Sequence, residues 1–155
     1  MKNRKRNSFY FIIILLLSSS CNNKTVYHSF LHIPDSGWDK NDTLSFNISV
    51  KDSMTYLHLS AEVRNKNDYP YQNLYLFIKN NLKDSSTWKI DTLRFLLIDK
   101  KGNWLGNGWG SLYQLDKPFD SLFVPHPGTF QIKISHGMKD VSLKGINDIG
   151  VRVER

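Results

Sequence analysis

Cys21 is the only cysteine in this chain of 155 residues, and its position gives it the most specific chemistry in the sequence. A single thiol excludes an intramolecular disulfide and any zinc or iron–sulfur site that needs several cysteines. Cys21 follows a basic segment (residues 1–7), nine uninterrupted apolar residues (9–17) and three serines (18–20), which is the layout of a secretory signal peptide. Small residues directly before a lone cysteine predict a lipobox, in which the thiol accepts a diacylglycerol and the signal is cut before the cysteine.

The alternative interpretation of this segment is an ordinary signal peptide with an incidental cysteine. Nine apolar residues span about 14 Å as a helix, roughly half of the hydrocarbon thickness, so a permanent transmembrane helix is not expected. Acyl chains on Cys21 would instead hold the protein durably at a membrane. No acidic run follows the cysteine, which favours a periplasm-facing position in the cell envelope over surface export. We therefore predict a signal peptide at residues 1–20, an anchor and short linker at 21–25, and one domain at 26–155.

The histidines do not form a convincing metal site. His28 and His32 are an even number of residues apart and would share one face of a strand. A metal site would need further ligands, for which Asp35 is the nearest candidate. Two polar residues on the wet face of a first strand are the simpler interpretation, and we predict no metal.

The carboxylates and the glycine-rich segment offer no clear catalytic set either. The only two glutamates, Glu62 and Glu154, are expected on outer faces of strands, and most aspartates fall in turns, where they cap backbone amides. The glycine-rich residues 102–110 lack the Lys-Ser/Thr pair and the following helix of a phosphate-binding loop. We predict no catalytic residue and no enzyme activity, and no cofactor other than the covalent lipid at Cys21.

Aromatic side chains are the remaining chemical surplus, with four tryptophans, seven tyrosines and nine phenylalanines. Most should fill a core, but exposed ones could anchor a protein interface or stack on sugars. Pro70 keeps Tyr69 out of the helical region, so Tyr69 and Tyr71 belong to an extended segment that is either a packed corner or a docking tip. Trp104 and Trp109 are an odd number apart, and in a regular strand would face opposite ways. These two pairs are the candidate partner-binding residues.

The charge balance does not indicate a nucleic-acid partner. The formal net charge is +7, but four of the 21 Lys and Arg lie in the first six residues. The rest of the chain has 17 basic and 14 acidic residues, which is too close to balance for an electrostatic nucleic-acid footprint.

Alternating apolar and polar residues dominate after Cys21. Strands with one buried face are predicted at residues 44–50, 57–64, 130–135 and 149–154. Residues 74–78 and 93–98 are more continuously apolar, so we expect both of their faces to be covered. No stretch has a convincing helical stripe, and Gly, Pro, Asn and Asp clusters separate the runs. The pattern predicts an all-β fold, an antiparallel β-sandwich of the jelly-roll or immunoglobulin-like kind.

An ordered set of motifs over nearly the whole mature chain resembles the GldH family of gliding-motility lipoproteins from Bacteroidetes-type bacteria. Besides Cys21 after an apolar signal, the matching motifs are Ile33-Pro34-x-x-Gly37-Trp38, Arg64-Asn65-x-Asn67-Asp68-Tyr69-Pro70-Tyr71-x-Asn73-Leu74, Asp91-Thr92-Leu93, Gly102-x-Trp104-Leu105-Gly106-x-Gly108, Pro127-Gly128-Thr129-Phe130 and Leu143-x-Gly145-Ile146-x-Asp148-Ile149-Gly150-Val151-Arg152.

The resemblance implies a membrane-anchored, non-enzymatic component that is needed for gliding and linked to type IX protein secretion. Its implied partners are other gliding-motility and type IX secretion proteins of the envelope, together with the membrane itself. Lipidation of Cys21 is the one residue role that it carries over. The alternative, which rests on the aromatic surplus, is a carbohydrate-binding envelope lipoprotein of a glycan-uptake system. That alternative requires a shallow groove with at least two exposed, coplanar aromatic rings.

Overall fold

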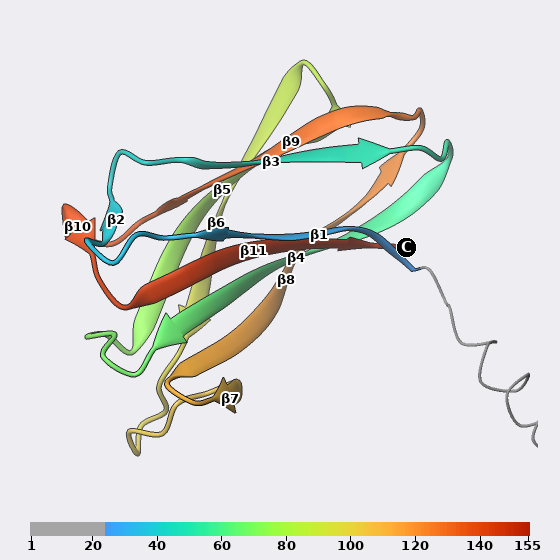
Figure 1. Ribbon diagram of the computed structural model, residues 1–155. Coiled ribbons are helices and arrows are strands. Elements are labelled where there is room, and N and C mark those ends of the chain that lie inside the picture. Colours follow the sequence, from blue (N-terminus) through green and yellow to red (C-terminus); the bar gives the residue numbers. More distant parts are fainter. Residues whose placement is uncertain (1–23) are drawn as a thin grey trace, which may run out of the picture.

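The computed structural model describes residues 24–155, so the predicted signal peptide and Cys21 lie outside the described residues. Within the described part the chain forms β-strands joined by turns (Figure 1). The strands are β1 (Thr25–His32), β2 (Trp38–Asp39), β3 (Leu44–Val50), β4 (Thr55–Lys66), β5 (Asn73–Asp84), β6 (Thr87–Leu96), β7 (Asn107–Trp109), β8 (Leu112–Val124), β9 (Gly128–His136), β10 (Ser142–Leu143) and β11 (Ile146–Glu154). Residues 24–155 contain no helix that is long and apolar enough to cross a membrane.

Two antiparallel sheets pack face to face. One has the strand order β1-β11-β4-β8-β7 and the other the order β3-β9-β5-β6, while β2 and β10 form a small separate ladder. Apart from the β5–β6 hairpin, which lies within one sheet, successive long strands cross between the sheets, which is the connectivity of a jelly roll. Figure 1 shows β3 and β9 above β1 and β11. The predicted all-β antiparallel sandwich is therefore confirmed.

Period-2 alternation explains why these segments lie against each other. In β3, Phe46, Ile48 and Val50 are buried while the residues between them are exposed. The same alternation on β4, β9 and β11 directs one face of each strand between the sheets. The four strands predicted from alternation are confirmed, and their inward side chains form one contiguous core.

The expectation that residues 74–78 and 93–98 are covered on both faces is wrong. Tyr75 and Phe77 point outward from β5 with 36% and 42% of their surface exposed, and Leu96 on β6 is 42% exposed. Although β5 lies between two neighbours, β6 is the edge strand of its sheet, and no further layer covers the outer face within the described residues. A continuous apolar run can therefore mark a strand that keeps aromatic side chains on the solvent side.

The sandwich has two ends that matter for function. At the end called proximal here, Lys24 and Arg155 meet through an Arg155 N–H to Lys24 carbonyl bond of 2.8 Å, next to the turns at residues 51–54 and 125–127. The opposite, distal end carries the β2–β10 ladder, the β4–β5 loop and β7. In Figure 1 the proximal end lies beside the C-terminus.

Candidate functional site

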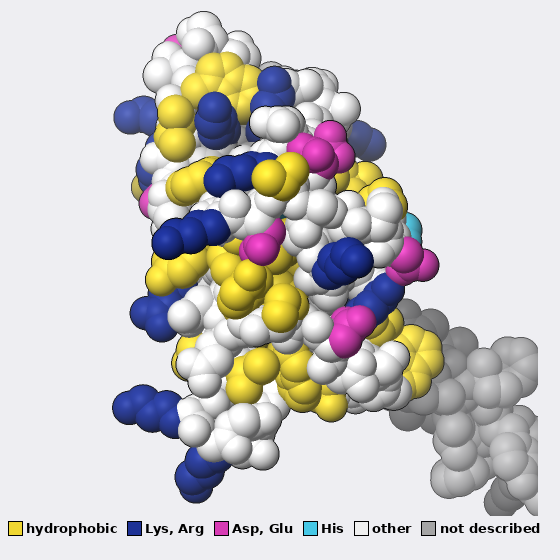
Figure 2. All heavy atoms as spheres, turned by 90° about the vertical axis from the view of Figure 1, so that its left-hand side faces the viewer, with side chains coloured by type: hydrophobic (Ala, Val, Ile, Leu, Met, Phe, Trp, Pro, Cys, Tyr) yellow, Lys and Arg dark blue, Asp and Glu magenta, His cyan; other side chains and the backbone are white. Residues whose placement is uncertain are grey.

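All four predicted partner-binding residues come to the distal end, but their environments differ. Tyr69 and Tyr71 lie in the β4–β5 loop with ring centroids 5.8 Å apart in a T-shaped arrangement. Trp104 precedes β7, and Trp109 ends it. Figure 2 looks onto this end and shows hydrophobic side chains gathered between Lys, Arg, Asp and Glu side chains.

Tyr69 is a packed corner of the core. Only 3% of its surface is exposed, and its hydroxyl donates to the Asn73 carbonyl at 2.9 Å. Burial raises the pKa of Tyr69 well above its ordinary value. Gly145 presses against it with a φ of +81°, and a Cβ there would lie 2.5 Å from the Tyr69 Cα. The sequence left open whether Tyr69 lies in a packed corner or in a docking tip. The structure shows a packed corner, so Tyr69 cannot contact a partner directly.

Tyr71 is the surface member of the pair. It is 38% exposed, and its hydroxyl donates to Asp140 Oδ1 at 3.0 Å. This hydrogen bond raises the pKa of the Tyr71 hydroxyl, so the group stays a neutral donor at neutral pH. Tyr71, Tyr75, Gly137 and Met138 line a hollow of about 300 Å³. An aromatic ring fixed by a hydrogen bond beside an apolar hollow suits a protein contact.

The two tryptophans of the glycine-rich segment do face different environments. Trp104 is half-buried and stacks on Tyr113 of β8, with ring centroids 5.4 Å apart. The preceding turn is held by Asp99, whose carboxylate accepts hydrogen bonds from the backbone N–H groups of Lys101 and Asn103 and from the Asn103 side chain. These bonds, that of the Asn103 side chain first, lower the pKa of Asp99. Trp104 therefore belongs to the framework of its loop.

Trp109 is the most exposed large hydrophobic residue of the described chain, at 88%. It closes the short β7–β8 hairpin opposite Leu112, and Gly110 provides the positive φ of +61° that the turn needs. Beside it, Arg64 donates through Nε to Gln114 Oε1 at 2.8 Å, and these residues line a hollow of about 320 Å³. Tyr71 and Trp109 are thus the two predicted residues that a partner can reach.

Buried polar contacts hold the distal end in place. Trp38 is 1% exposed, and its indole N–H donates to the Asp42 carbonyl at 3.1 Å. His136, also buried, contacts the Trp38 carbonyl through Nε2 at 3.1 Å and packs edge-on against the Trp38 ring. A carbonyl partner requires Nε2 to carry the proton, while Nδ1 has no partner among the described residues. Burial therefore lowers the pKa of His136.

Sequence reasoning missed a charge network on the outer face of the five-stranded sheet. Glu62 was expected in water but is fully buried. Its carboxylate contacts His28 Nε2 at 2.9 Å and Arg152 Nη2 at 2.5 Å, and Phe30 packs on Gly150 directly opposite Glu62. Glu62 lies on the outward face, as expected, but side chains from β1 and β11 cover it. Only the register of three strands could have revealed this.

His28, His32 and Asp35, which were considered as metal ligands and set aside, lie apart from one another in separate pairs. His28 contacts Glu62, and His32 Nδ1 lies 3.1 Å from Asp148 Oδ1, so each histidine has its own acidic partner. Asp35 pairs instead with Lys66 at 2.6 Å, and that hydrogen bond lowers the pKa of Asp35. Among residues 24–155 no group of three His, Cys, Asp or Glu side chains is arranged to hold a metal ion.

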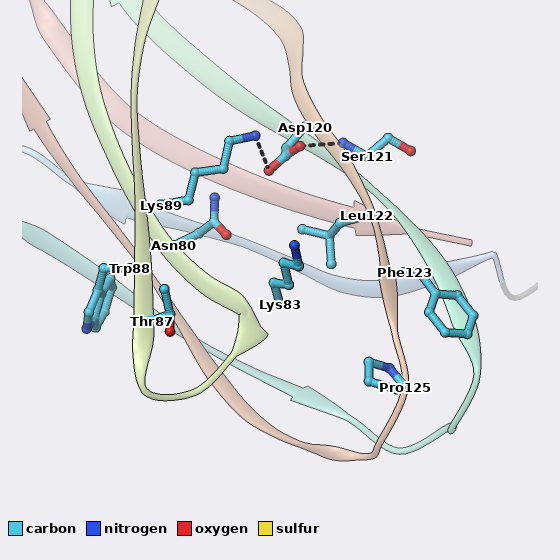
Figure 3. A pocket seen from close by; sticks show the side chains of 10 residues that line it. All are labelled: Asn80, Lys83, Thr87, Trp88, Lys89, Asp120, Ser121, Leu122, Phe123 and Pro125. Carbon is cyan, nitrogen blue, oxygen red and sulfur yellow. Dashed lines mark hydrogen bonds and ion pairs between the residues drawn. The ribbon is translucent and has the colours of Figure 1, made fainter.

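A further hollow of about 670 Å³ lies toward the proximal end, between β6 and β8. Figure 3 shows Lys89 reaching across it to Asp120, an ion pair of 3.0 Å, with Lys83 and Leu122 in the middle. Trp88 from β6 is on one side, and Phe123 and Pro125 from the end of β8 are on the other. The lining is mixed: Trp88, Leu122, Phe123 and Pro125 are apolar, and the other lining residues are polar or charged.

The tryptophans do not combine into a sugar platform. Trp38 is buried and Trp104 is half-buried. The two exposed tryptophans belong to different sheets. Trp88 lies on β6 next to the β5–β6 turn, and Trp109 lies on β7 at the distal end. A pair of coplanar exposed tryptophans, which would most directly favour carbohydrate binding, is not present in the described residues.

Comparison with known families identifies the relationship. A family model described as "GldH lipoprotein" matches residues 25–153, which is almost the whole described chain. The chain belongs to the GldH lipoprotein family. This confirms the resemblance drawn from the ordered motifs, and GldH lipoproteins are not an enzyme family.

Two relatives support the assignment to the GldH family. "Gliding motility lipoprotein GldH" of Flavobacterium johnsoniae is 27% identical over 142 residues, 87% of each chain. "Gliding motility lipoprotein GldH homolog" of Christiangramia forsetii is 31% identical over 143 residues, 87% of this chain and 86% of the relative. Among solved structures, a family 35 carbohydrate-binding module from Clostridium thermocellum aligns at a TM-score of 0.43 and 11% identity, over 86% of this chain and 94% of that module. That likeness is too distant to bear on ligand or function.

Proposed function

We propose that this protein is a lipid-anchored, non-catalytic interaction domain that supports gliding motility and type IX protein secretion at the cell envelope. The observation that carries the proposal is the match of residues 25–153 to the GldH lipoprotein family, whose relatives are named gliding motility lipoproteins. Cys21 is the proposed lipidation site, and the protein faces the periplasm. The carbohydrate-binding alternative has no observation in its favour beyond aromatic content.

The distal end is the proposed contact surface for other gliding or secretion proteins of the envelope. Tyr71 and Trp109 are exposed aromatics, a residue class that is enriched at the energetic centres of interfaces. The backbone behind them is rigid: Tyr69 anchors one loop, and the stack of Trp104 on Tyr113 anchors the other. A rigid loop lowers the entropy lost when a partner binds.

Gene deletion tests the function directly. Cells that lack the gene should fail to spread on agar and fail to secrete type IX cargo, and the wild-type gene supplied in trans should restore both. Normal spreading together with normal secretion in the deletion strain would refute the proposal. Loss of spreading with intact secretion would restrict the function to motility and would remove the type IX part.

The anchor and the contact surface are tested separately by variants in the complemented strain. Cys21→Ala should abolish palmitate labelling and release the protein from the membrane fraction; persistence of both would refute the anchor. Tyr71→Ala and Trp109→Ala should reduce spreading at normal protein levels. Ile90→Ala is the matched control, since Ile90 is an exposed apolar residue (64%) on β6 of the other sheet. Equal effects of all three variants would refute a specific distal surface.

A further inference from the structure

The proximal end is the part of the domain closest to Cys21. Three residues lie between Cys21 and Thr25, where β1 begins, and the four Cα-to-Cα steps that join them span at most about 14 Å when fully extended. The headgroup layer of a bilayer is itself about 5–8 Å thick. β1 has eight residues and leads away from this end over about 26 Å. If Cys21 is lipidated, as the proposed function states, the short segment between Cys21 and β1 holds the proximal end against the membrane.

The same end exposes apolar side chains at its turns. Met54 is 69% exposed, and it is the only non-glycine residue of residues 24–155 with a positive φ (52°). Tyr56 is 66% exposed and packs on Phe123, with ring centroids 5.0 Å apart. The β3–β4 turn is tied to the neighbouring turn by the Met54 N–H, which donates to the Pro125 carbonyl at 3.3 Å. An exposed methionine on a fixed turn and an exposed tyrosine at the start of the following strand β4 suit the headgroup layer, where amphipathic rings are enriched.

Basic side chains lie at this end, where the acidic residues are Asp52, Asp84 and Glu154. Lys51 and Lys83 are exposed, and neither forms an ion pair within residues 24–155. Arg155 pairs with Asp52, with Nη2 and Oδ2 2.5 Å apart and both side chains half exposed. Lys83 lines both hollows that flank Pro125, one of them drawn in Figure 3. Each Lys or Arg near an anionic lipid surface strengthens binding by about fivefold, so the charge complements anionic phospholipid headgroups.

We propose that the proximal end is a membrane-contact face, in which Met54 and Tyr56 enter the headgroup layer and Lys51 and Lys83 lie against anionic lipid phosphates. The domain then stands with its strands directed away from the bilayer. Tyr71 and Trp109 are held on the side remote from the lipid, facing the space in which envelope partners move. The protein surface thus contacts the membrane in addition to the acyl chains. Two membrane contacts fix the orientation of the domain, which a lipid anchor alone would not.

The test uses the full chain, purified in its lipidated form from cell membranes and reconstituted into vesicles of phosphatidylethanolamine with roughly a quarter of phosphatidylglycerol. Met54→Cys provides a free thiol for an environment-sensitive dye, because the Cys21 thiol is taken up by the lipid. Trp109→Cys is the matched control at the distal end. The emission of the dye at position 54 should shift to the blue on vesicles, and spin-labelled lipid should quench it, while the dye at 109 keeps its aqueous spectrum and is not quenched. Tyr56→Cys serves as a second probe if the Met54 variant does not fold.

The outcomes separate the face from the anchor. Flotation of the wild-type chain with vesicles reports the lipid anchor alone, and its failure overturns both ideas. Flotation with equal quenching at 54 and 109 overturns the contact face and leaves the anchor standing. Lys51→Glu with Lys83→Glu should lower the ratio of lipid-contacting to free orientations by at least about 25-fold in anionic vesicles. The same reversals at Lys100 and Lys101, in the distal loop, should leave it unchanged; an equal loss in both double variants would also overturn the proposal.

Discussion

Replacing Glu62 by alanine tests whether the buried charge network is structural. Glu62 is fully buried and contacts Arg152 at 2.5 Å and His28 at 2.9 Å. Breaking a buried ion pair from one side typically costs about 3–5 kcal/mol, because the remaining charge stays desolvated. The Arg152 side chain is 30% exposed, and Asp116 lies 3.8 Å away as a substitute partner. The cost should therefore fall at the lower end, about 3 kcal/mol.

The free energy of unfolding measures this effect. Urea titration of the full chain in mild detergent, followed by tryptophan fluorescence, to which the buried Trp38 contributes, should show a lower midpoint with an unchanged slope. In a thermal scan the same loss corresponds to a lower Tm by about 10 °C for a domain of this size. Glu62→Gln, which keeps the shape and one acceptor, should cost about 1–2 kcal/mol.

A matched control and a rescue make the reasoning refutable. Asp35 pairs with Lys66 at the surface with 85% of its side chain exposed, so Asp35→Asn should leave stability at the wild-type level. Replacing Glu62 and Arg152 together by leucine should recover part of the loss, because both charges leave the buried site. If Glu62→Ala stays within about 0.5 kcal/mol of wild type, the carboxylate is solvated in solution and the network contributes nothing.

Four further predictions follow from the distal end. Tyr69→Ala should cost about 3–5 kcal/mol of stability, measured by urea unfolding, whereas Tyr71→Ala should leave the unfolding midpoint unchanged. Gly145→Ala should lower the Tm, since a Cβ would lie 2.5 Å from the Tyr69 Cα at a φ of +81°; an unchanged Tm would contradict that geometry. Because the pKa of His136 is lowered by burial, the unfolded chain takes up a proton first, and stability should fall as the pH drops below about 6.5. His136→Gln should flatten that part of the pH profile, and an identical slope would exclude His136 as its cause. Trp109→Ala should reduce spreading without lowering the Tm, and a lowered Tm would mean that the ring packs in solution.

Much of the fold could be predicted because alternation is a local property. Phe46, Ile48 and Val50 recur at every second residue, and such residues necessarily point to one face of a strand. The assignment of β3, β4, β9 and β11 needed nothing else. The burial of the apolar runs could not be predicted in this way, because Tyr75 and Phe77 are exposed only by virtue of lying on the uncovered outer face of a sheet.

The candidate site was predictable in location more than in roles. Tyr69 and Tyr71 are two residues apart in the same loop, yet one is 3% and the other 38% exposed. Gly145, which is distant in sequence, lies directly against Tyr69, whereas the Tyr71 hydroxyl bonds to the surface residue Asp140. Trp104 and Trp109 also differ in exposure. Trp104 stacks on Tyr113, whereas no ring stacks on Trp109 among the described residues.

The sequence by itself determined that this is an all-β sandwich of the GldH lipoprotein family, with a lone cysteine placed after a signal-like segment. These properties depend on the order and periodicity of neighbouring residues. The tertiary structure alone decided that Glu62 is buried, that Tyr71 and Trp109 are the accessible aromatics, and that Met54, Tyr56 and unpaired lysines gather at the end where β1 begins. The physical reason is that burial and proximity arise from strand register and from the packing of segments far apart in the chain, which no local pattern records.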